Sequence, residues 1–431
     1  MHTRRGSFTM LALAAGLSAP AAAATPDAPS ADEIRALVAD MLADAQTRSS
    51  LLQTGATAGH DGGFFLASAD GSFRLNISGQ IQARYTLNFR DEGNPPVNDD
   101  FESGFTNPRT VLRFDGNIYD KFIYGIQGIF MRSGGGFTLE DAYAGYVSDS
   151  GLIFIVGQYR EPILWEDVLN DKYSLAVDQS VVNAVFAQGF SQGAWVHYQA
   201  DTWRFWAGVN DGIRSANSDL GADPADIGFT TRWEYKIGDA TWDQFGSFSS
   251  PRGSAYGVKL GGGVHYELGP HVPGPLPPAG IGTNETYLLA YTGDVMVQGD
   301  GWNVFAMGVG LQGEGNGGTP STSDFGVLVQ GGVFVTDQLE PFVRWDAVIP
   351  DNSRTGSSVF NTLTFGANYY IHGQAAKVTL DVQYFVDSVS SNGLVAATAT
   401  GAAGTPATRI GLLPTTDDGH FAVRLQFQLL F

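Results

Sequence analysis

The fold is decided by one stretch, FRLNISGQIQARYTLNFR at residues 73–90. Apolar or aromatic residues alternate here with polar or cationic ones, so that each set lies on its own face of an extended strand. Leu75, Ile77 and Tyr85 belong to the apolar set, and Arg84 belongs to the polar set. Strands of soluble proteins are mostly about 3–10 residues long, whereas a long strand with one fully polar face is typical of a wall between lipid and water. The stretch therefore predicts a strand of a transmembrane β-barrel.

The same alternation recurs to the end of the sequence and predicts sixteen strands. We expect them near residues 73–90, 105–118, 121–132, 137–148, 152–160, 189–199, 202–210, 227–237, 254–267, 284–297, 300–313, 323–336, 339–349, 359–371, 376–388 and 419–431.

The connections between these strands are mostly tight on one side and long on the other. Tyr119-Asp120 and Ala200-Asp201 are tight turns, whereas 161–188 and 389–418 are long. This segregation is typical of an outer-membrane barrel. Residues 238–253 break the rule, because they are long and yet fall on the short side. The predicted fold is all-β, a 16-stranded antiparallel transmembrane β-barrel over residues 64–431.

The N-terminal region has a different pattern. Residues 1–24 resemble a signal peptide, with Arg4 and Arg5 before a short apolar stretch and small residues after it. Residues 25–63 are read as a linker and a short amphipathic helix, because apolar residues between 32 and 53 recur at helical spacing. After export this helix would lie in the periplasm. Its apolar stripe could drive oligomerisation, could pack on the barrel mouth, or could have no role in assembly, and the sequence leaves these alternatives open.

The last strand ends in a pattern that resembles the recognition signal of the barrel-assembly machinery. Phe427, Leu429 and Phe431 alternate with Gln426 and Gln428. We therefore expect export to a bacterial outer membrane. Outer-membrane lipid, lipopolysaccharide and the assembly machinery are the expected partners.

Composition argues against several other functions. The net charge of -20 disfavours nucleic acid as a partner, because phosphate binding needs a basic surface. Cysteine is absent, and the seven histidines form none of the common metal or hydrolase motifs. We expect no enzyme activity, no catalytic residues, no metal and no cofactor. His265, which follows three glycines, is expected to be a residue of the barrel wall.

Five segments resemble the phosphate-selective porin O and P family: RTVLRFDGNIYDKFIYGIQGIF (109–130), EDAYAGY (140–146), GQYREP (157–162), KYSLAVDQSVVNAVF (172–186) and WRFWAGVNDG (203–212). RWEY (232–235) and GVKLGGGVHYE (257–267) are similar as well, so the resemblance extends over most of the chain. It implies a sixteen-stranded porin, a homotrimer with one pore per subunit, and a loop after GQYREP that folds into the lumen.

Residues 161–188 also stand out on their own, because this long loop is rich in apolar residues. Such a loop needs a surface to pack on, either the barrel interior or the external mouth. It is the candidate constriction loop. Its candidate residues are Glu161, Trp165, Glu166, Asp167, Asp171 and Lys172.

Selectivity in a channel comes from inward side chains at its narrowest part. Alternation places several charged residues on the polar face of their strands, with Arg113 and Arg160 as the first candidates. The others are Arg84, Arg109, Asp115, Arg204 and Arg232. Arginine suits anions because its planar guanidinium binds phosphate oxygens, but each arginine could equally brace the wall by pairing with an acid.

The sequence therefore predicts an outer-membrane porin for passive diffusion of small hydrophilic solutes or ions, with anions such as phosphate suggested by the family resemblance. The charge balance of 44 acidic against 24 basic residues does not support phosphate selectivity. The alternative is a structural or adhesive outer-membrane barrel without an open pore.

Overall fold

The computed structural model describes residues 36, 39–40, 56–61, 63–90, 101–130, 135–221, 224–269, 285–315, 321–400 and 411–431. The chain divides into two units, residues 1–56 and 57–431. Ala36, Ala39 and Asp40 of the first unit are helical. The predicted signal peptide and the rest of the predicted helix lie outside the described residues. Among the helices that the structure describes, none is long and apolar enough to cross a membrane.

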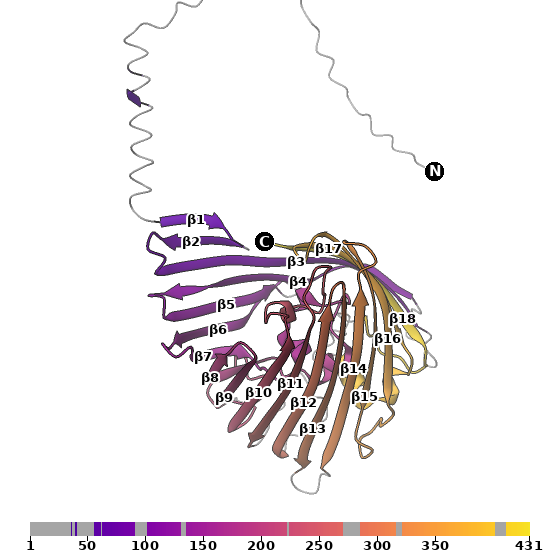
Figure 1. Ribbon diagram of the computed structural model, residues 1–431. Helices are drawn as coiled ribbons and strands as arrows, with labels where there is room; N and C mark the ends of the chain where they lie inside the picture. Colours follow the sequence, from indigo (N-terminus) through magenta and orange to yellow (C-terminus); the bar gives the residue numbers. More distant parts are fainter. Residues whose placement is uncertain are drawn as a thin grey trace, which may run out of the picture. The chain divides into compact units, whose positions relative to one another are not determined.

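The second unit contains a closed antiparallel barrel of sixteen strands, β3 to β18 (Figure 1). Each strand pairs with the next one in sequence, and β18 pairs with β3 to close the ring. The strands are β3 (Phe73–Phe89), β4 (Phe101–Ile118), β5 (Phe122–Phe130), β6 (Phe137–Val147), β7 (Ile153–Arg160), β8 (Phe190–Gln199), β9 (Trp203–Asn210), β10 (Ile227–Gly238), β11 (Gly257–Leu268), β12 (Glu285–Gly299), β13 (Trp302–Gly315), β14 (Thr322–Val333), β15 (Leu339–Ile349), β16 (Phe360–His372), β17 (Ala376–Phe385) and β18 (His420–Leu430). All sixteen predicted strands are confirmed.

Two short strands that the sequence did not predict lie at the seam of the barrel. They are β1 (Ala56–His60) and β2 (Phe64–Ser68), which pair with each other. β2 pairs with residues 74–77 of β3, and β18 pairs with residues 80–89 of the same strand. β2 and β18 therefore follow one another along β3.

Phe431 occupies the junction between these two strands. Its N–H donates to the carbonyl of Gly79 at 3.1 Å, and the Gly79 N–H donates to the Phe431 carbonyl at 2.8 Å. The Phe431 ring lies over Gly79, in the space that a Cβ at this position would occupy. The glycine is therefore required for the ring to sit there.

The two faces of the wall differ in polarity as the alternation predicts. On β10, Trp233 is 55% exposed on the outward face, whereas the neighbouring Arg232 is fully buried inside the barrel. Most of the large exposed apolar side chains in the described part of the chain belong to outward positions of the strands. This arrangement is the reverse of a soluble protein and suits a wall that faces lipid.

The turns at one end of the barrel are short, and we call this the short-turn end. Tyr119, Asp120 and Lys121 join the paired residues Ile118 and Phe122 in a three-residue turn, in which Tyr119 and Asp120 have φ of 53° and 59°. Connections of about 2–5 residues are usual between neighbouring antiparallel strands. The exception is the connection between β10 and β11, residues 239–256, which we call the turn insert. It contains the 3-10 helix η2 (Gln244–Gly246).

The apolar core lies inside the barrel. It is built from three large connecting segments, from Ile213 in the connection between β9 and β10, and from the inward side chains of the wall. The first is residues 161–188, the lumen loop, with α2 (Trp165–Val168), the 3-10 helix η1 (Asp171–Tyr173) and α3 (Val181–Phe186). The second is the turn insert. The third is the described part of residues 386–419, with the 3-10 helix η3 (Val389–Ser391) and α4 (Gly393–Thr400). Helix α3 contacts β14, β15 and α4.

Candidate functional site

The lumen loop is held by side chains that point inward from distant strands. Its backbone carbonyls accept hydrogen bonds from the opposite wall. The bonds are Arg344 Nη1 to Asp178 O at 2.8 Å, Lys377 Nζ to Ser174 O at 3.0 Å, Asn368 Nδ2 to Leu175 O at 2.9 Å, and Gln428 Nε2 to Lys172 O at 3.1 Å. Its apolar side chains, among them Ile163 and Val182, are fully buried. The loop therefore packs on the inner face of the wall.

Trp165 anchors the first part of the loop on a buried group of charges. This ionic cluster comprises Arg204, Arg232, Glu234, Lys259 and Asp294, from β9 to β12. Lys259 Nζ lies 3.4 Å from the centroid of the Trp165 ring, and the guanidinium of Arg232 lies 5.3 Å from it. A cation over an indole face is attracted by the ring's electrons, more strongly where water is excluded.

Within the ionic cluster, each cation has a carboxylate partner. Arg232 pairs with Asp294 at 2.6 Å, and Lys259 pairs with Glu234 at 3.0 Å. Arg204 pairs with Glu234 at 2.6 Å. Arg204 and Arg232, two of the predicted selectivity residues, are thus buried between the wall and the loop. Their pairing fits a bracing role.

A second anchor lies around Asp178 of the loop. Arg84 of β3 donates to its carboxylate at 2.9 Å, and Arg109 of β4 donates to the same carboxylate. Arg109 also pairs with Asp171 at 2.5 Å. Burial acts to raise the pKa of Asp178, but Arg109 and Arg84 outweigh it and hold the pKa well below its usual range. Arg84 and Arg109 thus fix the loop to the wall.

The acidic loop residues Glu161 and Glu166 are both buried. Glu161 accepts a hydrogen bond from Asn210 at 2.8 Å, and Glu166 accepts one from the Ser180 N–H at 2.8 Å. Burial raises the pKa of both carboxyl groups. These side chains shape the loop and have little contact with water.

One buried chain of hydrogen bonds has the order hydroxyl, imidazole, carboxylate. Thr230 Oγ1 lies 2.7 Å from His265 Nδ1, and His265 Nε2 lies 2.8 Å from Glu267 Oε2. Thr230 also accepts a bond from Asn210 at 2.9 Å. All of these side chains are buried, so a substrate has no approach to the hydroxyl. The arrangement braces the wall, as expected for His265. The described residues contain no group of three or more His, Asp or Glu side chains suited to hold a metal.

The charged side chains of the interior that still contact water lie on strands β4 to β7 and on the turn formed by the 3-10 helix η1 (Asp171–Tyr173), which faces these strands. Arg113 is 28% exposed and pairs with Asp115 at 3.0 Å and with Asp141 at 2.8 Å. Arg160 is 25% exposed and pairs with Asp167 at 2.5 Å. Both arginines are therefore paired with carboxylates, and both still contact water.

Lys172 has a different environment from these arginines. Its ammonium lies 5.1 Å from the Tyr173 ring centroid, and within the described part of the chain no carboxylate forms an ion pair with it. Burial lowers the pKa of Lys172, the positive charge of Arg113 lowers it further, and the negative charge of Asp115 opposes both. Lys172 of the loop and the Arg113–Asp115 pair of the wall thus act on one another here.

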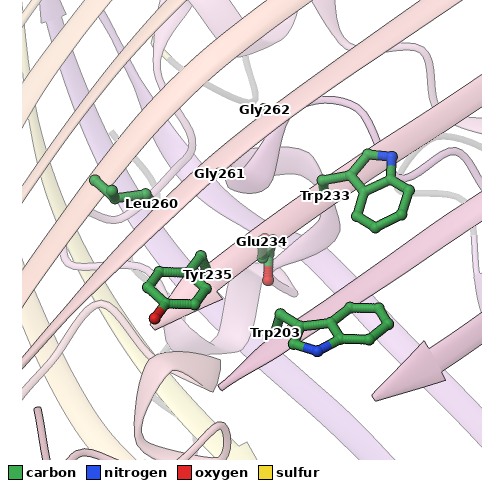
Figure 2. Close-up of a pocket in the computed structure, with 7 residues that line it drawn as sticks. All are labelled: Trp203, Trp233, Glu234, Tyr235, Leu260, Gly261 and Gly262. Carbon is green, nitrogen blue, oxygen red and sulfur yellow. The ribbon is translucent and has the colours of Figure 1, made fainter. Parts of the chain in front are cut away.

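The outward face of the wall has a shallow groove next to the ionic cluster. Figure 2 shows Trp203, Trp233, Tyr235 and Leu260 around it. The groove has a volume of about 370 Å³, with Gly261 and Gly262 at its floor. A Cβ at Gly261 would overlap the Arg232 guanidinium. The absence of a side chain at Gly261 therefore leaves room for the buried ions Arg232 and Asp294.

Several residues of this region were missed by reasoning from the sequence. Lys259, Glu234 and Asp294 complete the ionic cluster, and Asp141 and Tyr143 complete the surroundings of Arg113. The alternation on their strands places them on the inward face, so the signal was present. Alternation alone does not show which inward residues lie close together, and the expected site residues on the strands were arginines and Asp115.

Comparisons with known proteins place the fold. No family model matches the chain, and no curated protein matches it. Among solved structures, an anion-selective porin from Comamonas acidovorans has a TM-score of 0.57 at 9% identity, covering 83% of this chain and 99% of that one. OmpF of Salmonella typhi, in a complex with daunomycin, has a TM-score of 0.53 at 11% identity, covering 83% and 98%.

A loop-deletion variant of the outer membrane protein OmpT of Vibrio cholerae also has a TM-score of 0.53, at 13% identity, covering 84% of this chain and all of that one. At such low identities the likeness concerns the fold alone. The chain therefore has a porin fold, and its predicted place in the phosphate-selective family stays a prediction.

Proposed function

We propose that the protein is a channel of a bacterial outer membrane through which small hydrophilic solutes and ions diffuse passively. One observation carries this proposal. Inside a closed barrel with an apolar outer wall, charged side chains on β4 to β7 and on the turn Asp171–Tyr173 remain in contact with water, whereas the charges elsewhere along the loop are buried. A hydrated, charged sector between loop and wall is what a diffusion channel needs.

The selectivity proposed for this channel is weak, with a slight preference for anions such as phosphate. Arg113 and Arg160 have carboxylate partners, which cancel most of their charge at the distance of a passing ion. Lys172, like Arg214 and Lys236, is a half-buried cation that forms no ion pair among the described residues. Of these three, Lys172 lies on the segment that faces the hydrated sector, so we propose that it contributes most to the sign of the preference.

The assembly and location proposed for the protein follow from the same fold. One of the similar structures, OmpT of Vibrio cholerae, is described as a trimer, and we propose a homotrimer here. Phe427 and Leu429 are exposed on the outward face of β18, where the assembly machinery could bind them. Export through a signal peptide, and contact with lipid and lipopolysaccharide, belong to the same proposal.

A second candidate is a barrel that does not conduct. It is favoured by the extent of the interior core, to which residues of four connecting segments contribute. Conductance of the purified, folded protein in planar bilayers separates the two candidates. Discrete channels with a size limit for neutral sugars support diffusion, whereas folded protein that never conducts supports a structural or adhesive role.

A further inference from the structure

The turn insert, residues 239–256, reaches across much of the short-turn end of the barrel. It makes hydrogen bonds with the turns that join β8 to β9, β12 to β13, β14 to β15 and β16 to β17. These bonds are Trp242 Nε1 to Ala200 O at 2.9 Å, Gly253 N to Asp300 Oδ1 at 2.6 Å, Arg252 Nη2 to Phe334 O at 3.1 Å, and Gln374 Nε2 to Ser247 Oγ at 3.4 Å. A surface hairpin would contact its own strands and water, so this segment has another role.

The inner side of the insert packs into the lumen. Phe245 and Phe248 are buried, and the Phe248 ring lies 4.8 Å from the ring of Phe305 on the wall. The Phe248 N–H donates to the carbonyl of Tyr173 at 3.3 Å. The insert therefore touches the lumen loop at the turn that presents Lys172.

The partners of the insert all come from one side of the barrel. In the described part of the chain, its hydrogen bonds to other turns involve the β8–β9 turn and those of later strands. The accessible charges Arg113 and Asp115 lie on β4. The insert thus covers the sector that the apolar core fills, and the hydrated sector lies beside it.

We propose that the turn insert is a second size-determining element of the channel, which closes the short-turn end from β9 to β17 and confines solutes to the wall formed by β3 to β8. It also supports the turn Asp171–Tyr173 from the side opposite to the long loops. This proposal rests on the proposed channel function, and it assigns part of the channel's size limit to a segment outside the lumen loop.

Excision of the insert tests the proposal directly. The N–H groups of Asp239 and Ala240 both donate to the Tyr256 carbonyl, at 3.0 and 3.2 Å, so the two ends of the insert already lie together. Replacing residues 240–255 by Asn-Gly leaves two residues between Asp239 and Tyr256, the next pair in the β10–β11 register, and should form a two-residue turn without disturbing that pairing. We expect single-channel conductance to rise about twofold, with passage of larger sugars, because the short-turn end is then open.

A labelling experiment keeps the test decisive if the excised variant does not fold. The protein has no cysteine, so Gly246→Cys introduces a unique thiol. A Cβ at Gly246 has no neighbour within 4 Å, so the substitution fits. A bulky, charged thiol reagent on this residue should lower conductance. Ser150→Cys, in the exposed turn between β6 and β7, is the matched control and should conduct equally before and after labelling.

The outcomes separate the two proposals. Folded wild-type protein that never conducts refutes the channel itself. A conducting wild type whose conductance is unchanged by excision, or by labelling at Gly246→Cys, refutes the role of the insert. An equal loss on labelling Ser150→Cys also overturns it, because the effect would then not depend on the insert.

Discussion

Replacing Lys172 by glutamine removes a half-buried cation of the lumen loop that forms no ion pair among the described residues. A unit charge about 5 Å from a passing ion in water contributes roughly 0.8 kcal/mol. Screening at 0.1 M salt, where the Debye length is about 10 Å, reduces this to roughly 0.5 kcal/mol. Anions lose about twofold in local concentration and cations gain about twofold. The anion-to-cation permeability ratio should therefore fall about fivefold.

The assay is the reversal potential of single channels in a salt gradient. Lys121→Gln is the matched control, because Lys121 lies in the exposed turn between β4 and β5 and pairs with Asp149 at 2.7 Å. It removes the same charge away from the loop and should leave the reversal potential nearly unchanged. A Lys172→Gln channel with the wild-type reversal potential would show that this ammonium does not face the ion path.

The same substitution has a pH signature. Since the pKa of Lys172 is lowered by burial and by Arg113, its charge is lost on raising the pH earlier than that of an ordinary lysine. The anion preference of the wild type should decline over that range. In the Lys172→Gln channel the decline should be absent, and an identical decline in both would assign it to another group.

Three further predictions concern the framework. Gly261→Val places a side chain where the Arg232 guanidinium lies and should cost about 1–3 kcal/mol of stability, measured by urea unfolding in vesicles; an unchanged midpoint would contradict the packing argument. Asp178→Asn leaves two buried arginines without their shared carboxylate and should cost about 3–5 kcal/mol and raise open-channel noise. Because the pKa of Asp178 is lowered, the wild-type anchor is present above the usual pKa of aspartate and is lost only as pH falls through the lower value, so quiet channels are expected at pH 4. Gly79→Val removes the seat of the Phe431 ring and should slow assembly, seen as less protein with heat-modifiable mobility; normal assembly would mean that the ring can sit elsewhere.

The strands could be predicted because their signal is local. Each strand shows its own two-residue period, and tight turns such as Tyr119-Asp120 mark the ends. β1 and β2 were missed because five-residue strands contain too few alternations to be recognised. β2 is defined by its pairing with β3, a contact that the pattern within β2 does not show.

The role of each inward arginine could not be predicted from the sequence. Alternation placed Arg84, Arg204 and Arg232 on the inner face. Whether such a residue contacts water depends on the path of the lumen loop, which is set by contacts between residues far apart in sequence. Arg344, for example, bonds to Asp178 across 166 positions. Whether a side chain points inward is therefore decided by its own strand, whereas its contact with water is decided by residues far away in the sequence.

The path of the turn insert could not be predicted from the sequence either. Its length marked it as an exception among the short turns, but length does not reveal direction. The apolar residues Trp242, Phe245 and Phe248 distinguish it from a solvated loop. Like the apolar-rich loop 161–188, a segment with these residues needs a surface to pack on.

The closure of the barrel between β3 and β18 has a consequence for the order of folding. Arg84 and Gln426, which bond at 3.1 Å across this closure, are separated by 342 positions. Joining chain ends over such a length is entropically costly and slow, because nearly the whole chain must be ordered before this contact forms. Neighbouring strands can form hairpins early, each over a short loop. The last event is then the meeting of β18 with an already positioned β3, and until it happens both edges of the sheet stay open to wrong partners.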